Sequence, residues 1–284
     1  MTAFIDQLVI YPIKSIQGVQ QASSQVTLAG LYGDRRYMLV TPSGDFITAR
    51  THPLLSLVNA KTQANQQLQL SSPNSSTHLL LEPESFSTQY KKVLVWETEV
   101  AAQLCGRQYD AWFSDILQEP VQLVFFGKQS QRHTSRRPEL PVAFADGYPF
   151  LIISQASLFA LAQRCPEPMQ MERFRANLIV DGCSAFAEDS WHKIKIGEVV
   201  FEAVKPCIRC LFTTLDPTSA QRSKKGEPLR TLAKFRLLGK DGVTFGMNFV
   251  ALNEGQIHVG DKIEILSYRT AETYVDKSLV GTLS

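Results

Sequence analysis

Two cysteines, Cys207 and Cys210, lie three residues apart near the end of an apolar segment. Lys205 and Arg209 stand beside them, and nearby positive charge favours the thiolate form of a cysteine. A thiolate is both a nucleophile and a ligand for soft metal ions. The spacing and the charges therefore indicate redox or metal chemistry at residues 204–210.

Several interpretations of this pair compete. A closed zinc site needs about four protein ligands; the pair supplies two, and Cys183 and His192 are the further candidates. A thioredoxin-like dithiol belongs in a strand–helix context, which this segment lacks. A single thiolate that binds a metal carried by a cofactor needs one cysteine and basic residues to hold that cofactor. Two partly buried thiols in a turn are an equally good interpretation of the motif alone.

Further polar residues stand near the ends of predicted strands, where side chains can converge on one site. Taken singly, each is best interpreted as a surface cation or as a polar group that satisfies the core. Together they offer cations and short polar side chains that could bind a phosphate and a polar heterocycle. These residues are Lys14, Ser15, Arg35, Thr48, Arg50, Arg175 and Asn177.

The elements that must position these residues are mostly short strands. Alternating or β-branched runs predict strands over 4–11, 36–40, 46–50, 67–70, 78–81, 93–96, 121–126, 177–180, 193–196, 199–204, 249–252 and 262–266. Helical spacing is found over 101–117, interrupted at Gly106, and again after Ser154, a plausible N-cap. Many strands with few helices predict a β-rich α+β fold, barrel-like, with two lobes that meet near Pro120.

Composition narrows the class of protein. The 284 residues carry 29 Lys and Arg against 27 Asp and Glu, so a net charge of +2 gives no reason to expect nucleic acid or an anionic membrane as a partner. No apolar run approaches the roughly 18 residues of a membrane-spanning helix, and the N-terminus shows no secretory signal. Five cysteines, an odd number, argue against a disulfide framework. We expect a cytoplasmic protein.

The polar segment 129–138 contains Arg132, His133, Arg136 and Arg137. A solvated loop is the preferred interpretation. The alternative is a rim that docks an anionic ligand or an acidic redox partner.

With these residues in place, the sequence resembles the MOSC-domain molybdenum enzymes, which include the mitochondrial amidoxime reducing component and bacterial YcbX-like proteins. The resemblance runs in order from about residue 4 to residue 268. The segments that carry it are Tyr11-Pro12-Ile13-Lys14-Ser15, Gly33-Asp34-Arg35, Phe46-Ile47-Thr48-Ala49-Arg50, Phe144-Ala145-Asp146-Gly147-Tyr148-Pro149, Phe174-Arg175-Ala176-Asn177, Lys205-Pro206-Cys207-Ile208-Arg209-Cys210 with Thr213-Thr214, Phe245-Gly246-Met247-Asn248 and Val259-Gly260-Asp261.

The resemblance implies a fold, a cofactor and a set of site residues. It implies a β-rich MOSC N-terminal domain at 1–120, a MOSC β-barrel domain at 121–268 and a tail at 269–284. It implies molybdenum bound to molybdopterin in the mono-pterin form, with Cys210 as the metal ligand and catalytic residue; pyridoxal phosphate is not expected. The residues implied around the cofactor are Lys14, Ser15, Arg35, Arg175 and Asn177, with Arg209 beside the ligand and Thr48, Arg50 and Asn248 as further pocket residues.

The same resemblance implies reduction of N-hydroxylated small molecules, such as hydroxylamino-purines and amidoximes, a detoxifying oxidoreductase activity. Some relatives continue into a ferredoxin domain, but no cysteine follows Cys210, so we expect no iron–sulfur cluster in this chain. Electrons are then expected from a separate flavoprotein reductase or ferredoxin. Ala176 replaces the family's proline, and variation at the position of Ser184 leaves the proton donor unassigned.

Two alternatives of other classes stay open. One is a non-catalytic carrier of sulfur or of molybdenum cofactor that uses the Cys210 thiolate. The other is a zinc-stabilised β-domain.

Overall fold

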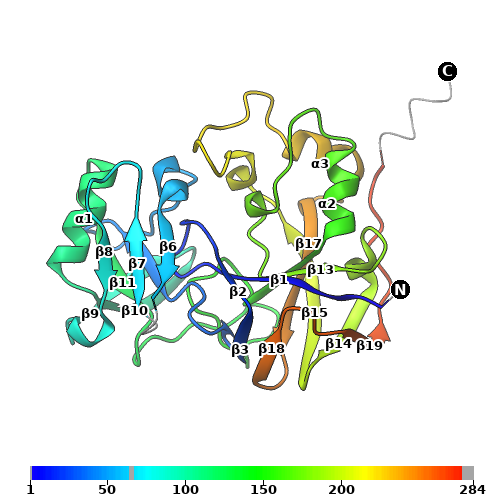
Figure 1. Ribbon diagram of the computed structural model, residues 1–284, viewed down its shortest axis with the longest axis horizontal. Helices are drawn as coiled ribbons and strands as arrows, with labels where there is room; N and C mark the ends of the chain where they lie inside the picture. Colours follow the sequence, from blue (N-terminus) through cyan, green and yellow to red (C-terminus); the bar gives the residue numbers. More distant parts are fainter. Residues whose placement is uncertain (1, 64–66, 277–284) are drawn as a thin grey trace.

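The computed structural model describes residues 2–63 and 67–276, which form two lobes side by side (Figure 1). The larger lobe is built on a sheet with the order β19-β14-β15-β17-β12-β13-β1-β2, and β16 pairs with β17. These strands are β1 (Phe4–Ile10), β2 (Val19–Gln21), β12 (Phe150–Ser154), β13 (Leu178–Asp181), β14 (Trp191–Ile196), β15 (Val199–Ile208), β16 (Leu237–Leu238), β17 (Gly242–Ala251) and β19 (Ile263–Tyr268).

The remaining strands form three smaller sheets. The second lobe holds a sheet of β5 (Tyr37–Val40), β11 (Gln122–Phe125), β10 (Thr98–Leu104) and β9 (Tyr90–Val95), and another of β6 (Asn59–Thr62), β7 (Leu68–Ser71) and β8 (Leu79–Leu81). The third pairs β18 (Gly255–His258) with β3 (Ser23–Thr27), which pairs with β4 (Gly30–Leu31).

Helices are short and lie outside the sheets. The α-helices are α1 (Arg107–Leu117) on the smaller lobe, and α2 (Gln155–Ala162) and α3 (Leu229–Phe235) on the larger one (Figure 1). The 3-10 turns are η1 (Pro53–Leu57), η2 (Pro83–Ser85), η3 (Met171–Arg173), η4 (Ala187–Ser190) and η5 (Leu211–Thr214). None of the helices within the described ranges is long and apolar enough to cross a membrane.

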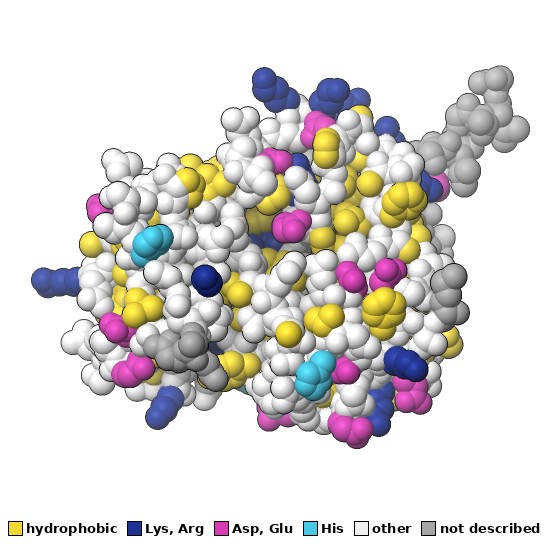
Figure 2. Space-filling model, in the orientation of Figure 1, with side chains coloured by type: hydrophobic (Ala, Val, Ile, Leu, Met, Phe, Trp, Pro, Cys, Tyr) yellow, Lys and Arg dark blue, Asp and Glu magenta, His cyan; other side chains and the backbone are white. Residues whose placement is uncertain are grey.

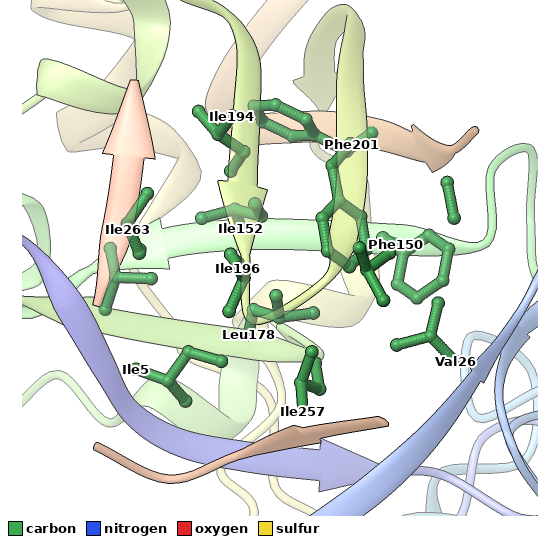
Figure 3. Close-up of a cluster of buried hydrophobic side chains, with 14 of the residues drawn as sticks. Ile5, Val26, Phe150, Ile152, Leu178, Ile194, Ile196, Phe201, Ile257 and Ile263 are labelled. Carbon is green, nitrogen blue, oxygen red and sulfur yellow. The ribbon is translucent and has the colours of Figure 1, made fainter. Parts of the chain in front are cut away.

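The main core lies inside the curved large sheet. In β14, Ile194 and Ile196 alternate with lysines, so the apolar residues point inward and the lysines outward. Phe150 and Phe201 meet edge to face, with ring centroids 5.2 Å apart at 85°. Figure 3 shows these side chains pointing toward one another from several strands. This packed sheet is the rigid base on which the polar loops stand.

The chain passes between the lobes more than once. β1 and β2 pair into the large sheet, with β1 antiparallel to β13, although they come first in the sequence. β11, which follows Pro120, pairs with β5 in the smaller lobe. Strands from both sides of residue 120 thus share sheets. The division into 1–120, 121–268 and 269–284 stays a prediction, and residues 277–284 of that tail lie outside the described part.

The β-rich α+β class and the β7–β8 hairpin are confirmed. Ser154 caps α2, as predicted, by accepting a hydrogen bond from the Ser157 amide at 3.0 Å. Two local predictions are wrong. Residues 101–104 form strand β10, because their pairing with β9 overrides a weak helical spacing. Residues 46–50 form an isolated bridge at Phe46 and then turn, because the Thr48 carbonyl accepts the amides of Thr51 and His52.

Gly246 offers a test of how tightly the large sheet is packed. It lies in β17 with φ +79°, and an added Cβ would stand 2.5 Å from Cγ1 of Ile153 and 3.0 Å from the carbonyl oxygen of Ile152. Gly246→Ala is expected to lower the free energy of unfolding by about 2–4 kcal/mol, from backbone strain and overpacking together. Gly239→Ala has a positive φ but open space, so urea denaturation should show the strain alone, about 1–2 kcal/mol. Equal losses in both variants would contradict this account.

Candidate functional site

Cys210 stands where the long strand β15 gives way to η5. The register of β15 against β17 shifts between Ala203 and Lys205 and again between Pro206 and Ile208. Such irregularities bend a strand and re-aim its side chains. Cys210 caps η5 in an extended conformation and is partly buried. The bend therefore carries the second cysteine of the pair out of the sheet.

The two cysteines of the pair contact different arginines. Arg209 Nη1 lies 2.9 Å from Cys207 Sγ, and Cys207 packs at the margin of the core around Phe174. Cys210 Sγ accepts from Nη1 of Arg50, which comes from the other lobe, at 3.7 Å. The pair therefore does not share one environment, and Cys210 is the cysteine that faces across the lobes.

Arg50 belongs to a charged group that we call the thiol cluster, consisting of Cys210, Arg50, Asp146 and Lys14. Nη1 of Arg50 lies 3.3 Å from Oδ2 of Asp146. Lys14 pairs with the other carboxylate oxygen of Asp146 and donates to the carbonyl oxygen of Phe144 at 2.8 Å. The Lys14 side chain is 6% exposed, whereas that of Asp146 is 57% exposed. The carboxylate thus links two cations, Lys14 and Arg50, that are remote from it in the sequence.

Burial and neighbouring charge act in opposite directions on these groups. Burial lowers the pKa of Lys14 to about 8, against the attraction of Asp146, which raises it. The Asp146 carboxylate is partly desolvated although its side chain is 57% exposed, and this alone would raise its pKa; the charges of Lys14 and Arg50 outweigh it and hold that pKa below its ordinary value. Asp146 is therefore ionised at neutral pH and serves as the negative charge among several positive ones.

A second group, the guanidinium cluster, adjoins the thiol cluster and consists of Arg35, Arg175, Asn177, Asp34 and Tyr11. Arg35 Nη1 contacts Oδ2 of Asp34 at 2.7 Å and Oδ1 of Asn177 at 2.9 Å. The guanidinium carbon of Arg35 lies 4.4 Å from the Tyr11 ring centroid, and that of Arg175 lies 4.0 Å from it. Burial, followed by the nearby charge of Arg35, lowers the pKa of Arg175 to about 10.

Three residues of the predicted site adopt left-handed backbone conformations. They are Ser15 with φ +78°, Arg35 with φ +45° and Arg175 with φ +57°. Such conformations are unusual for residues other than glycine and tend to occur at functional sites, where the fold maintains the strain. Each of them lies in a sharp turn beside a strand of the rigid base, so the turns bring the three residues toward one region.

The remaining predicted residues occupy supporting positions. Thr48 is buried, and its hydroxyl accepts the Arg50 amide at 3.3 Å, which fixes the turn that carries Arg50. Arg209 turns from Cys210 toward Cys207 and donates to the Phe174 carbonyl at 2.7 Å. Asn248 lies on β17 in register with Lys205. The structure thus brings Lys14, Arg50 and Cys210 into one cluster and Arg35, Arg175 and Asn177 into the adjoining one.

Sequence reasoning missed the structural part played by Arg132. Arg132 is 7% exposed and donates to the carbonyl oxygens of Ala143 at 2.9 Å and Asp146 at 2.8 Å. The prediction of a solvated loop or docking rim is therefore wrong at Arg132, which instead holds the loop that carries Asp146. Asp146 itself lay in a segment that supported the family resemblance, a signal that could have selected it. Nothing in the sequence distinguished Arg132 from exposed Arg136.

The predicted zinc ligands do not assemble. Within residues 2–63 and 67–276, no group of three or more His, Cys, Asp or Glu side chains is arranged to hold a metal ion. His192 Nδ1 lies 3.1 Å from the Ser267 hydroxyl on β19. Burial of the Cys183 thiol, followed by the nearby charge of Glu188, raises the pKa of Cys183 to about 11. A closed zinc site is therefore not formed by these side chains.

The donors present fit an anionic cofactor with a soft metal. Nη2 of Arg50 is buried and has no hydrogen-bond partner, beside the Cys210 sulfur that its Nη1 contacts. An unpartnered buried donor is costly unless a ligand completes it. A cavity of about 400 Å³ lies beside Arg175 and is lined by Tyr11, Phe212 and several carboxamides, but by no residue of the thiol cluster. Figure 2 shows a hollow between the lobes with basic side chains at its floor.

Comparison with known proteins shows the family to which the chain belongs. Residues 2–120 match the MOSC N-terminal beta barrel domain, and residues 139–264 match the MOSC domain, so the chain is a MOSC-domain protein. Mitochondrial amidoxime-reducing component 1 of Homo sapiens is 34% identical over 281 residues, covering 92% of this chain and 82% of that protein. Component 2 of Homo sapiens is 32% identical, covering 91% and 82%. The chain belongs to the family of these amidoxime-reducing components.

A solved structure shows a more distant likeness. The YUAD protein from Bacillus subtilis aligns with a TM-score of 0.43 at 14% identity, covering 95% of this chain and 98% of that one.

Arg132→Gln tests whether this arginine organises the Asp146 loop. The variant leaves buried carbonyl oxygens without their charged donor, so we expect the free energy of unfolding to fall by about 2–4 kcal/mol. Hydrogen exchange should quicken first over residues 140–147. Arg136→Gln removes an exposed arginine of the same segment and should change neither quantity. Similar effects in both variants would show that Arg132 has no special part.

Proposed function

We propose that the protein is a molybdenum-cofactor-dependent reductase of N-hydroxylated compounds, with Cys210 as the protein ligand to the metal. The observation that carries the proposal is the position of the Cys210 sulfur, half-buried and next to an Arg50 guanidinium that keeps an unused buried donor. The relatives are amidoxime-reducing components, and this supports the substrate class. Amidoximes and hydroxylamino-purines are the substrates we expect.

The residues of the two clusters would contact different parts of the cofactor. Cys210 supplies the soft sulfur ligand, and Lys14, Arg35 and Arg175 supply positive charge for a phosphate. Ser15 and Asn177 offer short polar groups to a heterocycle. When bound, molybdenum on a single pterin supplies two-electron chemistry with an oxygen acceptor. The donor set therefore suits the mono-pterin form, in which one protein thiolate is needed.

The chain's own residues would hold the site in a reactive state. Arg50, whose Nη1 contacts both the Cys210 sulfur and Asp146, would place positive charge beside an approaching N–OH oxygen, and Lys14 lies on the other side of the same carboxylate. The negative charge of Asp146 offsets the repulsion between Arg50 and Lys14. The overall reaction converts R–NHOH, two electrons and two protons into R–NH₂ and water.

The two electrons must arrive from a donor, and the surface beside Cys210 suits an acidic one. The loop after η5 carries Arg222, Lys224 and Lys225, all exposed. Arg222 Nη1 donates to the Leu211 carbonyl at 3.2 Å, which ties this basic loop to the residue after Cys210. Complementary charge speeds the encounter of redox proteins. A separate flavoprotein reductase or ferredoxin with an acidic surface is the proposed partner.

Cys210→Ala and Cys207→Ala test the proposal as a matched pair. In protein from a molybdenum-replete host, Cys210→Ala is expected to lower bound molybdenum or benzamidoxime reduction by at least about 100-fold, since the metal loses its thiolate. Cys207→Ala should keep much of both, because its sulfur contacts Arg209 instead. Metal analysis, oxidised-pterin fluorescence and turnover with reduced methyl viologen measure these outcomes. Equal loss in both variants would indicate a dithiol, and a wild type limited to one turnover would indicate a carrier.

Charge reversal of the basic loop tests the donor surface. Lys224→Glu with Lys225→Glu should slow turnover with reduced plant-type ferredoxin by about tenfold or more at low salt, because favourable steering becomes repulsion. Turnover with reduced methyl viologen should stay unchanged. Lys128→Glu with Lys262→Glu makes the same change of net charge at exposed lysines elsewhere and should leave both rates unchanged. Loss with methyl viologen as well would place the effect in the site and not in docking.

A further inference from the structure

Trp96 is an exposed tryptophan in an unusual backbone position. Val95 of β9 pairs with Thr98 of β10, so Trp96 and Glu97 form a two-residue hairpin turn. Trp96 has φ +57°, in a turn where asparagine or glycine is the ordinary choice. Its side chain is 44% exposed, whereas Trp112 and Trp191 are 7% and 1% exposed. A strained position occupied by a large exposed ring indicates a use for that ring.

The ring of Trp96 and the sulfur of Cys210 both contact the side chain of Arg50. The guanidinium carbon of Arg50 is 4.5 Å from the Trp96 ring centroid, and Nη1 of the same group is 3.7 Å from Cys210 Sγ. Phe46 supports the ring at a centroid distance of 5.2 Å. The hairpin is held in place by the Leu94 amide, which donates to the Gly44 carbonyl at 2.9 Å. Trp96 is thus fixed at the smaller lobe's side of the thiol cluster.

A second exposed apolar side chain, from the larger lobe, belongs to a residue whose backbone is tied to that of Arg50. Leu211, the residue after Cys210, is 61% exposed. Arg222 donates to the backbone carbonyls of both Leu211 and Arg50, so the two backbones are held close together. We call Trp96 and Leu211 the apolar rim. Trp96 contacts the Arg50 guanidinium, and Leu211 follows Cys210 in the chain, so exposed apolar side chains from both lobes belong to the surroundings of the thiol cluster. A polar centre with apolar groups near it suits a flat molecule with one polar end.

We propose that the apolar rim binds the ring of an aromatic N-hydroxylated substrate, with the ring against Trp96 and the N–OH group directed to the thiol cluster. This inference rests on the proposed function and adds a specificity-determining residue to it. An indole face favours a planar aromatic partner through stacking and loss of water. A small aliphatic amidoxime has the same polar end but nothing to place against Trp96. Trp96 therefore sets the preference for aromatic over aliphatic substrates.

The experiment compares benzamidoxime with acetamidoxime in the cofactor-loaded enzyme, with reduced methyl viologen as donor. In Trp96→Ala, the KM for benzamidoxime is expected to rise about tenfold, with kcat and molybdenum content unchanged and the KM for acetamidoxime unaltered. Trp96→Phe should restore most of the benzamidoxime affinity. Tyr32→Ala removes another exposed aromatic, 68% exposed, and should alter neither KM. An equal rise for both substrates, or none, would overturn the proposal, since the first would mean that Trp96 only supports Arg50.

A binding measurement separates this inference from the proposed function. Without reductant, benzamidoxime should quench the fluorescence of the wild type and acetamidoxime should not, and the quenching should vanish in Trp96→Ala. If the wild type reduces neither amidoxime but the quenching pattern holds, the proposed reaction fails while the ring site stands. If both amidoximes are reduced without Trp96-dependent quenching, the ring site fails and the reaction stands.

Discussion

The carboxylate of Asp146 is the contact on which the site depends. It pairs with Lys14 and Arg50. The charge of Arg35 also lowers the pKa of Asp146, and the charge of Asp146 acts to raise the pKa of Arg175. Without a negative charge there, the cations would repel one another in a partly desolvated region. The lowered pKa of Lys14 shows that burial still disfavours its charge despite this pairing. The anionic cofactor that we propose would supply the further negative charge that these cations lack, and Asp146 already supplies part of it.

The large sheet holds the residues of these clusters in place. Ser15, Arg35 and Arg175 have left-handed backbones, and such residues persist only where the surrounding structure determines them. The large sheet does so, because β1 and β13 pair with each other next to these turns and are buried against a continuous apolar core. The strain of the turns is therefore offset by packing elsewhere, and the functional residues stand on the most rigid part of the molecule.

Local patterns in the sequence predicted much of the fold and part of the site. Alternation identified strands such as 193–196, and charges beside Cys210 indicated a thiolate site. The pairing of β1 with β13 and of β11 with β5 joins residues far apart in the chain, so no local pattern could reveal it. The same holds for Arg132, whose burial depends on a loop that folds over it. Asp146 lay in a segment that carried the family resemblance, but no local pattern selected it, because its cationic partners are remote in sequence.

The spacing of Cys207 and Cys210 alone could not distinguish a dithiol, a zinc half-site and a single metal ligand. The register shifts of β15 bear on this choice, because the two sulfurs that follow them contact different arginines. One sulfur meets an arginine of its own segment, two residues away, at the edge of a core. The other meets an arginine from the opposite lobe, among cations that exceed the nearby acids. A dithiol needs both sulfurs in one place, and zinc needs further ligands beside them, so this geometry favours the single-ligand role that we propose for Cys210 over those two.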